Sequence, residues 1–491
     1  MRAAWAALPL GSWLLGACLL PAPAAAGPAE EPAFPRGEVI ERVATTKDPA
    51  LTYALYLSTL PPGVPPGRPA PILYAFDDRG KARDLTARLR AAAERYGWIV
   101  ASPYSSSHRI PMEENFKIMS GLWADTHARL AIDDNRVYAF GFSGLVRFVC
   151  MLGLTAPEGL AGVIGASGGF PLGHPPTRDT PFPFFATVGD KDFNYYELLD
   201  LDEKMASLGI PHRVEVFAGS HEWPSEALLA AALGWMELQA MRRGTREKNP
   251  AVLAALWDQD LARAKALDAE GRTLEAVRAY TALAADFAGL REARDLEQVA
   301  RRRAELAASA AFLSESKTRM ERDRRDREYL EKVPRILAAA AAAPNDGSSQ
   351  GLAQTVAELM IPDLKRGAKA AADPEEKLAA ERLLNAVYIQ TGLHLPREAA
   401  ERGQLDRAIF YLQIAEEIDP DVPQIPFRMA VAWAQQGNRP KALEELAVAV
   451  QKGWTDLVAL ESERAFDPLR RTEGYKRVVS ELLRRQRLSA R

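Results

Sequence analysis

The sequence has 491 residues and a mass of 53.8 kDa, enough chain for about two or three domains of ordinary size. Its 62 Lys and Arg residues stand against 65 Asp and Glu residues, so the formal net charge of −3 provides no basic field for nucleic acid or an anionic membrane. With 47% hydrophobic residues, 33 Gly and 34 Pro, the composition excludes a low-complexity polymer and indicates folded, loop-rich domains.

The N-terminus carries an apolar stretch from Ala3 to Leu20, which is followed by a tract of small residues. This pattern predicts a secretory signal peptide over residues 1–26, and the mature protein is therefore expected in the periplasm or outside the cell. Cleavage after Ala26 fits an Ala-x-Ala site. The string Leu-Gly-Ala-Cys that ends at Cys18 resembles a bacterial lipobox, so a lipid anchor on Cys18 is the alternative and the only membrane attachment that we expect.

Either form of processing leaves Cys150 as the one ordinary thiol of the mature chain. Cys150 lies on an apolar helical run, Val146 to Leu154, without a neighbouring His or Lys. It is therefore predicted to be a small buried hydrophobe and not a catalytic thiol.

Residues 37–242 alternate short apolar runs with amphipathic stretches, which is typical of an α/β domain with a mostly parallel sheet. Eight strands are predicted, at Val39–Ala44, Tyr53–Ser58, Ile72–Phe76, Trp98–Ser102, Val137–Phe142, Gly162–Gly165, Phe184–Val188 and Arg213–Phe217. Helices are predicted at Leu85–Tyr96, Met112–Leu130, Gly144–Leu154 and Tyr195–Leu208.

The strand signals stop near Arg242, and two all-helical regions are predicted over residues 250–344 and 350–482. In the second region a set of small and apolar residues recurs after 34 residues, which is the tetratricopeptide period. A fainter copy lies in the first region. Such repeats predict either a site for a protein partner or helices that only support the α/β domain. The recurring residues are Gly403, Ala408, Leu412 and Ala415, then Gly437, Ala442, Leu446 and Ala449, with Gly271, Ala276 and Tyr280 as the fainter copy.

Two serines compete for the role of a catalytic nucleophile. Ser167 lies in a literal Gly-x-Ser-x-Gly string, whereas Ser143 lies in Gly-Phe-Ser-Gly-Leu, with Leu145 at the last position. Ser143, however, follows a predicted strand and opens a predicted helix, which is the setting of a nucleophile elbow. Ser167 is followed by Gly-Gly-Phe-Pro, which cannot begin a helix directly. We therefore predict Ser143 as the nucleophile.

An acid and a base follow in the order that a Ser…Asp…His triad needs. The loop after the strand Phe184–Val188 contains Asp190 and Asp192, of which Asp192 is preferred because Asp190 beside Lys191 is more easily a solvated turn charge. His221 follows the last strand in a Gly-containing loop. The predicted triad is therefore Ser143, Asp192 and His221.

The oxyanion hole is expected to use the backbone N–H of Gly144 and that of Asp78, in the loop after the third strand. Tyr104, Tyr195 and Trp223 flank the predicted strand ends and are candidates for lining a substrate pocket, although packing would explain them equally well. No His has a partner at metal-ligand spacing, and no nucleotide-binding loop is found, so neither a metal nor another cofactor is expected.

With these residues in place, the chain from Val39 to about Arg242 resembles the exported bacterial α/β-hydrolases of the esterase and polyhydroxybutyrate-depolymerase-like group. The resemblance is carried by Gly-Phe-Ser-Gly at 141–144, Ser-Gly-Gly-Phe-Pro at 167–171, Val-Gly-Asp-Lys-Asp at 188–192 and Gly-Ser-His-Glu-Trp-Pro at 219–224. It implies a serine esterase that cleaves a small ester or acyl substrate, less readily a peptide.

The sequence departs from that family in two places, because Leu145 replaces a usual Gly and the His-Gly-Gly string of many lipases is missing. These departures motivate an alternative hypothesis. In it, the chain is a non-catalytic envelope scaffold in which a decayed hydrolase fold and the helical repeats bind a partner.

Overall fold

The computed structural model describes residues 34–59, 67–78, 80–342 and 349–489. The predicted signal peptide, with its two alternative processing sites at Ala26 and Cys18, lies outside the described residues.

A single eight-stranded sheet forms the centre of the first half of the chain, in the order β1-β2-β4-β3-β5-β6-β7-β8. Only β2 runs antiparallel to its neighbours, β1 and β4. This is the sheet of an α/β-hydrolase, and all eight predicted strands are confirmed. Their bounds are β1 Val39–Ala44, β2 Thr52–Leu57, β3 Ala70–Phe76, β4 Ile99–Pro103, β5 Ile132–Phe142, β6 Gly162–Ala166, β7 Phe184–Gly189 and β8 His212–Phe217.

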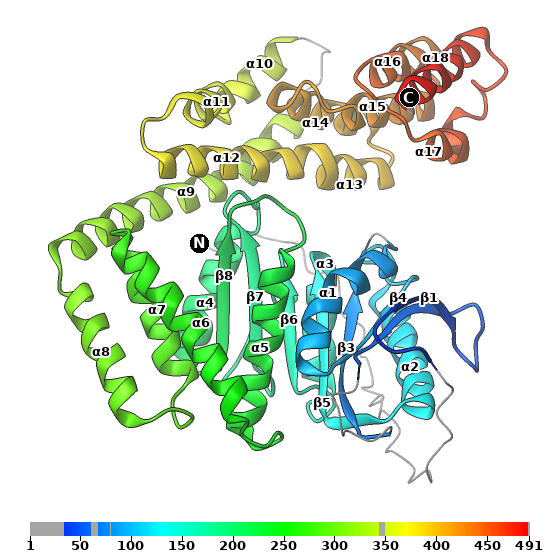
Figure 1. Cartoon of the computed structure of the whole chain (residues 1–491). Helices are drawn as coiled ribbons and strands as arrows, with labels where there is room; N and C mark the ends of the chain where they lie inside the picture. The colour runs from blue at the N-terminus through cyan, green and yellow to red at the C-terminus, as the bar shows by residue number, and fades with distance from the viewer. Residues whose placement is uncertain (1–33, 60–66, 79, 343–348, 490–491) are drawn as a thin grey trace.

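Helices cover both faces of this sheet (Figure 1). Two separate apolar layers result, because strands of a parallel sheet are buried on both sides. The helices that pack on one face are α2 (Met112–Arg129), α3 (Gly144–Thr155) and α4 (Tyr195–Leu208), and those on the other are α1 (Ala82–Tyr96) and α5 (Glu226–Arg243). Cys150 is fully buried in α3, as predicted, and burial raises the pKa of its thiol.

The carboxyl ends of the central strands lie side by side at one edge of the sheet. The register pairs Phe142 of β5 with Ala166 of β6, Ala166 with Thr187 of β7, and Gly189 with Phe217 of β8. The loops that follow β5, β7 and β8 therefore meet at this edge, where ligands of open α/β sheets usually bind.

The second half of the chain is helical throughout, as predicted. Among its described helices and those of the first half, none is both long and apolar enough to cross a membrane. Its elements are α6 Pro250–Ala269, α7 Thr273–Asp286, α8 Ala293–Ala307, α9 Ala310–Ala342, α10 Ser349–Glu358, α11 Ile361–Ala370, α12 Pro374–Ile389, the π-helix η1 Gln390–His394, α13 Leu395–Glu401, α14 Leu405–Ile418, α15 Gln424–Gln435, α16 Arg439–Gln451, α17 Leu457–Ser462, the 3-10 helix η2 Arg464–Phe466 and α18 Glu473–Ser489.

The residues that recur after 34 positions occupy equivalent places in the structure. Gly403 and Gly437 both have a positive φ, 71° and 80°, and each lies two residues before the start of a new helix. The small and apolar residues that follow these glycines in α14 and α16 are buried. Small residues at these places let neighbouring helices approach closely. A tetratricopeptide role in binding a partner stays a prediction.

The helical half lies across the carboxyl edge of the sheet, so that α12 and α13 are close to the ends of the strands (Figure 1). The long helix α9 fastens the two halves together. The Tyr196 hydroxyl donates a 2.6 Å hydrogen bond to Asp326, Arg319 donates to the Tyr195 hydroxyl at 2.9 Å, and Leu330 packs against the core of the α/β half. The predicted domain boundary near Arg242 is thus followed by helices that pack back on the first domain.

Candidate active site

Ser143 lies on a sharp turn between β5 and α3. Its backbone has φ 56° and ψ −127°, a conformation that is unfavourable for any residue with a side chain. Gly141 permits the turn, because a Cβ at this position would lie only 2.6 Å from the carbonyl oxygen of Leu145. The turn is held to the next strand by a 2.8 Å hydrogen bond from the Ser143 N–H to the Ala166 carbonyl. These features are those of a nucleophile elbow.

The structure brings the three predicted triad residues into one hydrogen-bonded chain. The Nε2 atom of His221 lies 2.8 Å from the Oγ of Ser143. Its Nδ1 atom lies 3.1 Å from each carboxylate oxygen of Asp192. The Asp192 side chain is completely buried, whereas that of His221 is 22% exposed. The geometry allows His221 to take a proton from Ser143 while Asp192 fixes the orientation of the imidazole.

Neighbouring groups hold the imidazole ring and its two loops in place. Phe193, the residue after Asp192, stacks on the His221 ring with centroids 4.4 Å apart. The Asp190 carboxylate accepts a 3.1 Å hydrogen bond from the Gly219 N–H, and the Lys191 N–H donates to the Gly219 carbonyl at 2.9 Å. The acid loop and the histidine loop are therefore tied directly to each other. Sequence reasoning did not single out Phe193, although its position next to the acid was the available signal.

The two residues predicted for the oxyanion hole both lie next to the short loop that contains Ser107 and His108. Gly144 is the first residue of α3, where backbone N–H groups have no acceptor within the helix. Asp78 follows β3, and its carboxylate accepts hydrogen bonds from the Ser107 hydroxyl at 2.8 Å and from the His108 N–H at 2.6 Å. The same carboxylate lies 2.5 Å from Nδ1 of His108. Asp78 thus fixes the loop that contains His108.

His108 lies directly over Gly144. A Cβ on Gly144 would be 2.7 Å from the Cβ of His108, so the glycine is required for this contact. His108 is a site residue that sequence reasoning missed, since it has no motif and lies 35 residues before the nucleophile.

The rejected alternatives take no part in the hydrogen-bonded chain of the triad. Ser167 is fully buried after β6, and its N–H and carbonyl are bonded to Thr187 and Asn194. Neither His221 nor Asp192 contacts the Ser167 hydroxyl within the part of the chain that the structure describes. Leu145, the residue that departs from the family pattern, points into the apolar core with no exposed surface. The Leu145 side chain therefore does not project toward solvent beside Ser143.

The three predicted pocket aromatics have different surroundings. Tyr104 faces β1, because its hydroxyl donates to the Glu41 carbonyl and Arg42 covers its ring at 4.5 Å. The structure does not bring Tyr104 to the triad, since the strand pairing that we could not predict places β4 next to the β1–β2 edge. Tyr195 is buried beneath the helical half, and Trp223 packs edge-on against Phe142, whose ring lies 5.1 Å from His221.

Helix α12 of the helical half holds the acid loop from outside. Arg382 donates a 2.9 Å hydrogen bond to the Asp190 carbonyl, and Asn385 donates a 2.8 Å hydrogen bond to the Lys191 carbonyl. The Lys191 ammonium pairs with Glu381 at 2.8 Å. These contacts join residues about 190 positions apart in the sequence, which is why sequence reasoning missed them.

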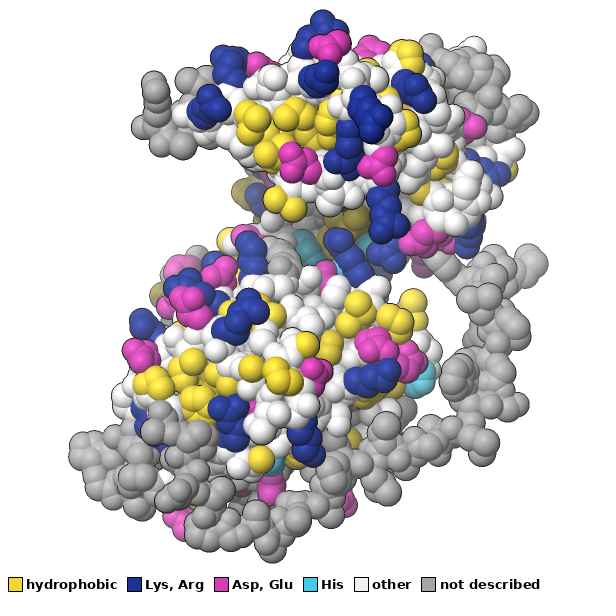
Figure 2. Space-filling model, turned by 90° about the vertical axis from the view of Figure 1, so that its right-hand side faces the viewer, with side chains coloured by type: hydrophobic (Ala, Val, Ile, Leu, Met, Phe, Trp, Pro, Cys, Tyr) yellow, Lys and Arg dark blue, Asp and Glu magenta, His cyan; other side chains and the backbone are white. Residues whose placement is uncertain are grey.

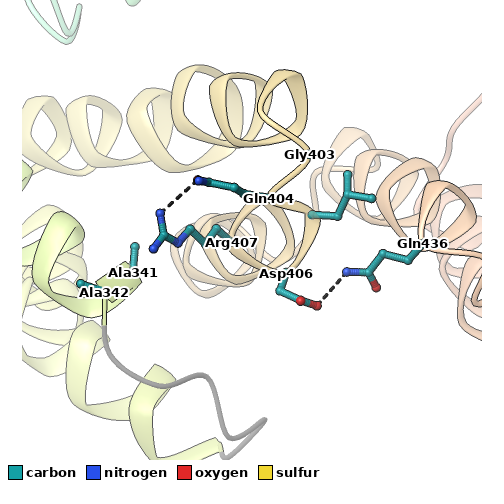
Figure 3. Close-up of a pocket in the computed structure, with 8 residues that line it drawn as sticks. Ala341, Ala342, Gly403, Gln404, Asp406, Arg407 and Gln436 are labelled. Carbon is teal, nitrogen blue, oxygen red and sulfur yellow. Dashed lines mark hydrogen bonds between the residues drawn. The ribbon is translucent and has the colours of Figure 1, made fainter.

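A separate cavity of about 590 Å³ lies between the end of α9 and the turn that begins α14 (Figure 3). Its polar side chains bond to one another, with Arg407 donating to Gln404 at 3.0 Å and Gln436 donating to Asp406 at 2.7 Å. None of the triad residues lines this cavity, and its polar groups are already paired, so we assign no ligand to it.

No known protein-family model matches the sequence, and no curated protein is similar to it. Several solved structures are similar to about two fifths of the chain. S-formylglutathione hydrolase (FrmB) from Staphylococcus aureus is 14% identical, with a TM-score of 0.33, over 41% of this chain and 98% of its own. The feruloyl esterase module from Clostridium thermocellum is 14% identical, with a TM-score of 0.33, over 40% and 87%. An esterase from Pyrobaculum calidifontis is 12% identical, with a TM-score of 0.33, over 42% and 86%.

Proposed function

We propose that this protein is a serine hydrolase that cleaves ester bonds through an acyl-enzyme, with Ser143 as nucleophile, His221 as general base and Asp192 as orienting acid. The observation that carries the proposal is the chain of hydrogen bonds from the Ser143 Oγ through His221 to the buried Asp192 carboxylate. A peptide bond is the less favoured substrate, because an amine is a poorer leaving group than an alcohol.

The reaction follows from this geometry in two halves. The Ser143 oxygen attacks the ester carbonyl while its proton passes to Nε2 of His221, 2.8 Å away. The negative charge that develops on the carbonyl oxygen is stabilised by backbone N–H groups, of which Gly144 supplies one at the start of α3. The imidazolium then protonates the leaving alcohol, and an acyl-enzyme forms. Water repeats the steps and releases the carboxylic acid.

Export through a signal peptide at residues 1–26 and a protein partner for the helical repeats belong to the same proposal. A signal peptide would place the enzyme outside the cytoplasm. The contacts of α12 with the acid loop support a further role of the helical half within the catalytic domain itself.

The proposal is tested by labelling the purified protein with a fluorophosphonate, which forms a covalent adduct with an activated serine. We expect the adduct on Ser143, mapped by mass spectrometry, and its loss in Ser143→Ala and in His221→Ala. Ser167→Ala is the matched control, because Ser167 has the same unusual φ, 57°, but its hydroxyl has no hydrogen-bond partner among the described residues. This variant should be labelled like the wild type.

Each outcome has a defined meaning. An adduct on Ser167, or an adduct on Ser143 that persists in His221→Ala, would contradict the assigned triad. A folded protein that takes no label and hydrolyses no 4-nitrophenyl ester would favour the non-catalytic scaffold instead.

A further inference from the structure

Basic side chains of both halves of the protein gather where the helical half meets the acid-loop edge of the α/β half (Figure 2). We call Arg109, His108, His394 and Arg428 the basic wall. The first two lie in the loop after β4, and the other two lie at the end of η1 and in α15. Figure 2 shows Lys or Arg and His side chains in the hollow between the two bodies. The net charge of the whole chain is −3, so this gathering is local and does not reflect a basic protein.

The α/β side of the wall is fixed beside the nucleophile. His108 is anchored by Asp78, through its N–H at 2.6 Å and its Nδ1 at 2.5 Å, and lies in contact distance of Gly144. Arg109 follows immediately and is exposed to solvent. The backbone of Arg109 is therefore fixed next to His108, which contacts Gly144 at the start of α3.

The helical side of the wall is placed by the contacts of α12. Arg382 and Asn385 bind the acid loop, and the chain then runs directly through η1, which ends at His394. Arg428 of α15 is half-buried and donates a hydrogen bond from its guanidinium to the Gly392 carbonyl. Its position is therefore tied to the same segment.

The basic groups on one side of the hollow disfavour protonation of the basic groups on the other. Burial lowers the pKa of His394, and the charges of His108, Arg397 and His221 lower it further. Burial also lowers the pKa of Arg428, and the charge of Arg109 acts in the same direction. His394 is therefore within electrostatic reach of His108, and Arg428 within reach of Arg109.

The neighbouring carboxylates are already engaged. Asp192 is bonded to His221, Asp78 to His108, and Glu401 to Arg397 at 2.9 Å. Across the described ranges, no carboxylate lies within ion-pair distance of Arg109, His394 or Arg428. Arg109 and Arg428 are therefore like charges without a carboxylate partner, which is unfavourable, and an anion bound between them would reverse that balance.

We propose that Arg109 and Arg428 bind an anionic group, a carboxylate or a phosphate, on the ester that Ser143 attacks. The inference rests on the proposed function and names its substrate class, an ester with one negative group close to the scissile bond. A guanidinium suits this role because it donates two parallel hydrogen bonds to a carboxylate or a phosphate.

Hydrolysis of matched ester pairs tests the inference. An anionic group on the acyl part of the ester is tested by comparing mono-4-nitrophenyl succinate with the neutral 4-nitrophenyl pentanoate. An anionic group on the alcohol part is tested by comparing 4-acetoxybenzoate with its methyl ester. A third acyl ester, 4-nitrophenyl 3-phosphonopropanoate, separates phosphate-like from carboxylate recognition. In at least one pair the wild type should favour the anionic ester by about tenfold or more in kcat/KM.

Charge-removing variants locate the preference. Arg428→Gln and Arg109→Gln should each lower kcat/KM for the favoured anionic ester by about tenfold and change that for its neutral partner by less than about twofold. Arg407→Gln is the matched control, since Arg407 lies in α14 and lines the separate cavity. If Arg428→Gln does not fold, the exposed Arg109 carries the test.

A binding measurement separates failure of this inference from failure of the proposed function. In the Ser143→Ala protein, calorimetry should detect monomethyl succinate or its phosphonate analogue but not dimethyl succinate, and Arg428→Gln should raise the Kd about tenfold. The inference is overturned if neither ester pair shows a preference, or if the two Arg variants leave both hydrolysis and binding unchanged. Missing turnover and missing fluorophosphonate labelling, with anion binding intact, would instead overturn the serine-hydrolase function alone.

Discussion

Removing the contacts of α12 with the acid loop should slow catalysis without removing any catalytic group. Asn385→Ala deletes the donor to the Lys191 carbonyl, and Arg382→Met deletes the donor to the Asp190 carbonyl while keeping an apolar stem at a buried position. The loop keeps its own hydrogen bonds to the histidine loop, so the net loss is about 1 kcal/mol for each missing bond. If that energy is lost from the transition state, kcat falls about fivefold for Asn385→Ala and about 30-fold for the double variant.

The assay is kcat and KM for a 4-nitrophenyl ester, together with the rate of fluorophosphonate labelling. We expect kcat and the labelling rate to fall together while KM changes little, because Asp192 orients the base and does not bind substrate. Asn385→Asp, which is isosteric but sets an oxygen against the Lys191 carbonyl, should be worse than Asn385→Ala. Arg319→Met is the control, since it removes a hydrogen bond to Tyr195 in the same interface without touching the acid loop. A folded double variant that keeps the wild-type labelling rate would refute the reasoning.

Three further predictions concern the acid, the elbow and the helical half. Asp192→Asn should lower kcat by about 10³–10⁴-fold, because the imidazole loses its acceptor. Asp190→Asn keeps an oxygen for the Gly219 N–H and should lower kcat by less than about tenfold. Equal losses of ester hydrolysis in the two variants would leave Asp192 without its assigned role. Gly141→Ala should lower the free energy of unfolding by about 1–3 kcal/mol in a denaturant titration, because its Cβ would meet backbone atoms at 2.6 Å, and an unchanged stability would contradict the close approach. Burial and the nearby carboxylates, Glu416 first, raise the pKa of Glu445 from 4.5 to about 7, so the folded state loses stability as the pH rises through this range. Glu445→Gln should remove this loss, which is at most about 3 kcal/mol between pH 5 and 8 in thermal unfolding. A variant with the pH profile of the wild type would count against the shifted pKa.

The α/β half could be predicted closely from the sequence because its signals are local. Buried parallel strands appear as short apolar runs, and the helices between them begin and end within about three residues of their predicted bounds. The largest boundary difference is at β5, which begins at Ile132 and not at Val137. The polar residues 133–136 hide this extension, although Ala70 of β3 pairs with Ile132 at its start. The order of Ser143, Asp192 and His221 along the chain was equally local information, since each follows a recognisable strand.

The packing of the second half on the first could not be predicted in this way. The contacts that matter join α12 to the acid loop and α9 to α4, at residues some 120 to 195 positions earlier, as in the bond from Arg319 to Tyr195. Periodicity shows that a helix has a buried face but does not say what covers it. Tyr195, an expected pocket residue, is consequently held in the interface, where the Arg382 guanidinium lies 4.4 Å from its ring. Sequence also could not show that His108 covers Gly144, because a close approach between two loops leaves no pattern.

The two departures from the family pattern do not favour a decayed site. Leu145 fills the core beneath the turn, and Asp78, in the loop that lacks His-Gly-Gly, makes three contacts to residues 107 and 108. Ser143 meanwhile keeps a backbone conformation that costs about 1–3 kcal/mol, and its hydroxyl is aimed at His221. Ser167 shares the unusual φ, but it is buried without such a partner. A scaffold gains nothing from a strained serine bonded to an imidazole and a buried carboxylate, whereas a hydrolase requires all three. The geometry therefore supports catalysis over partner binding as the role of this half.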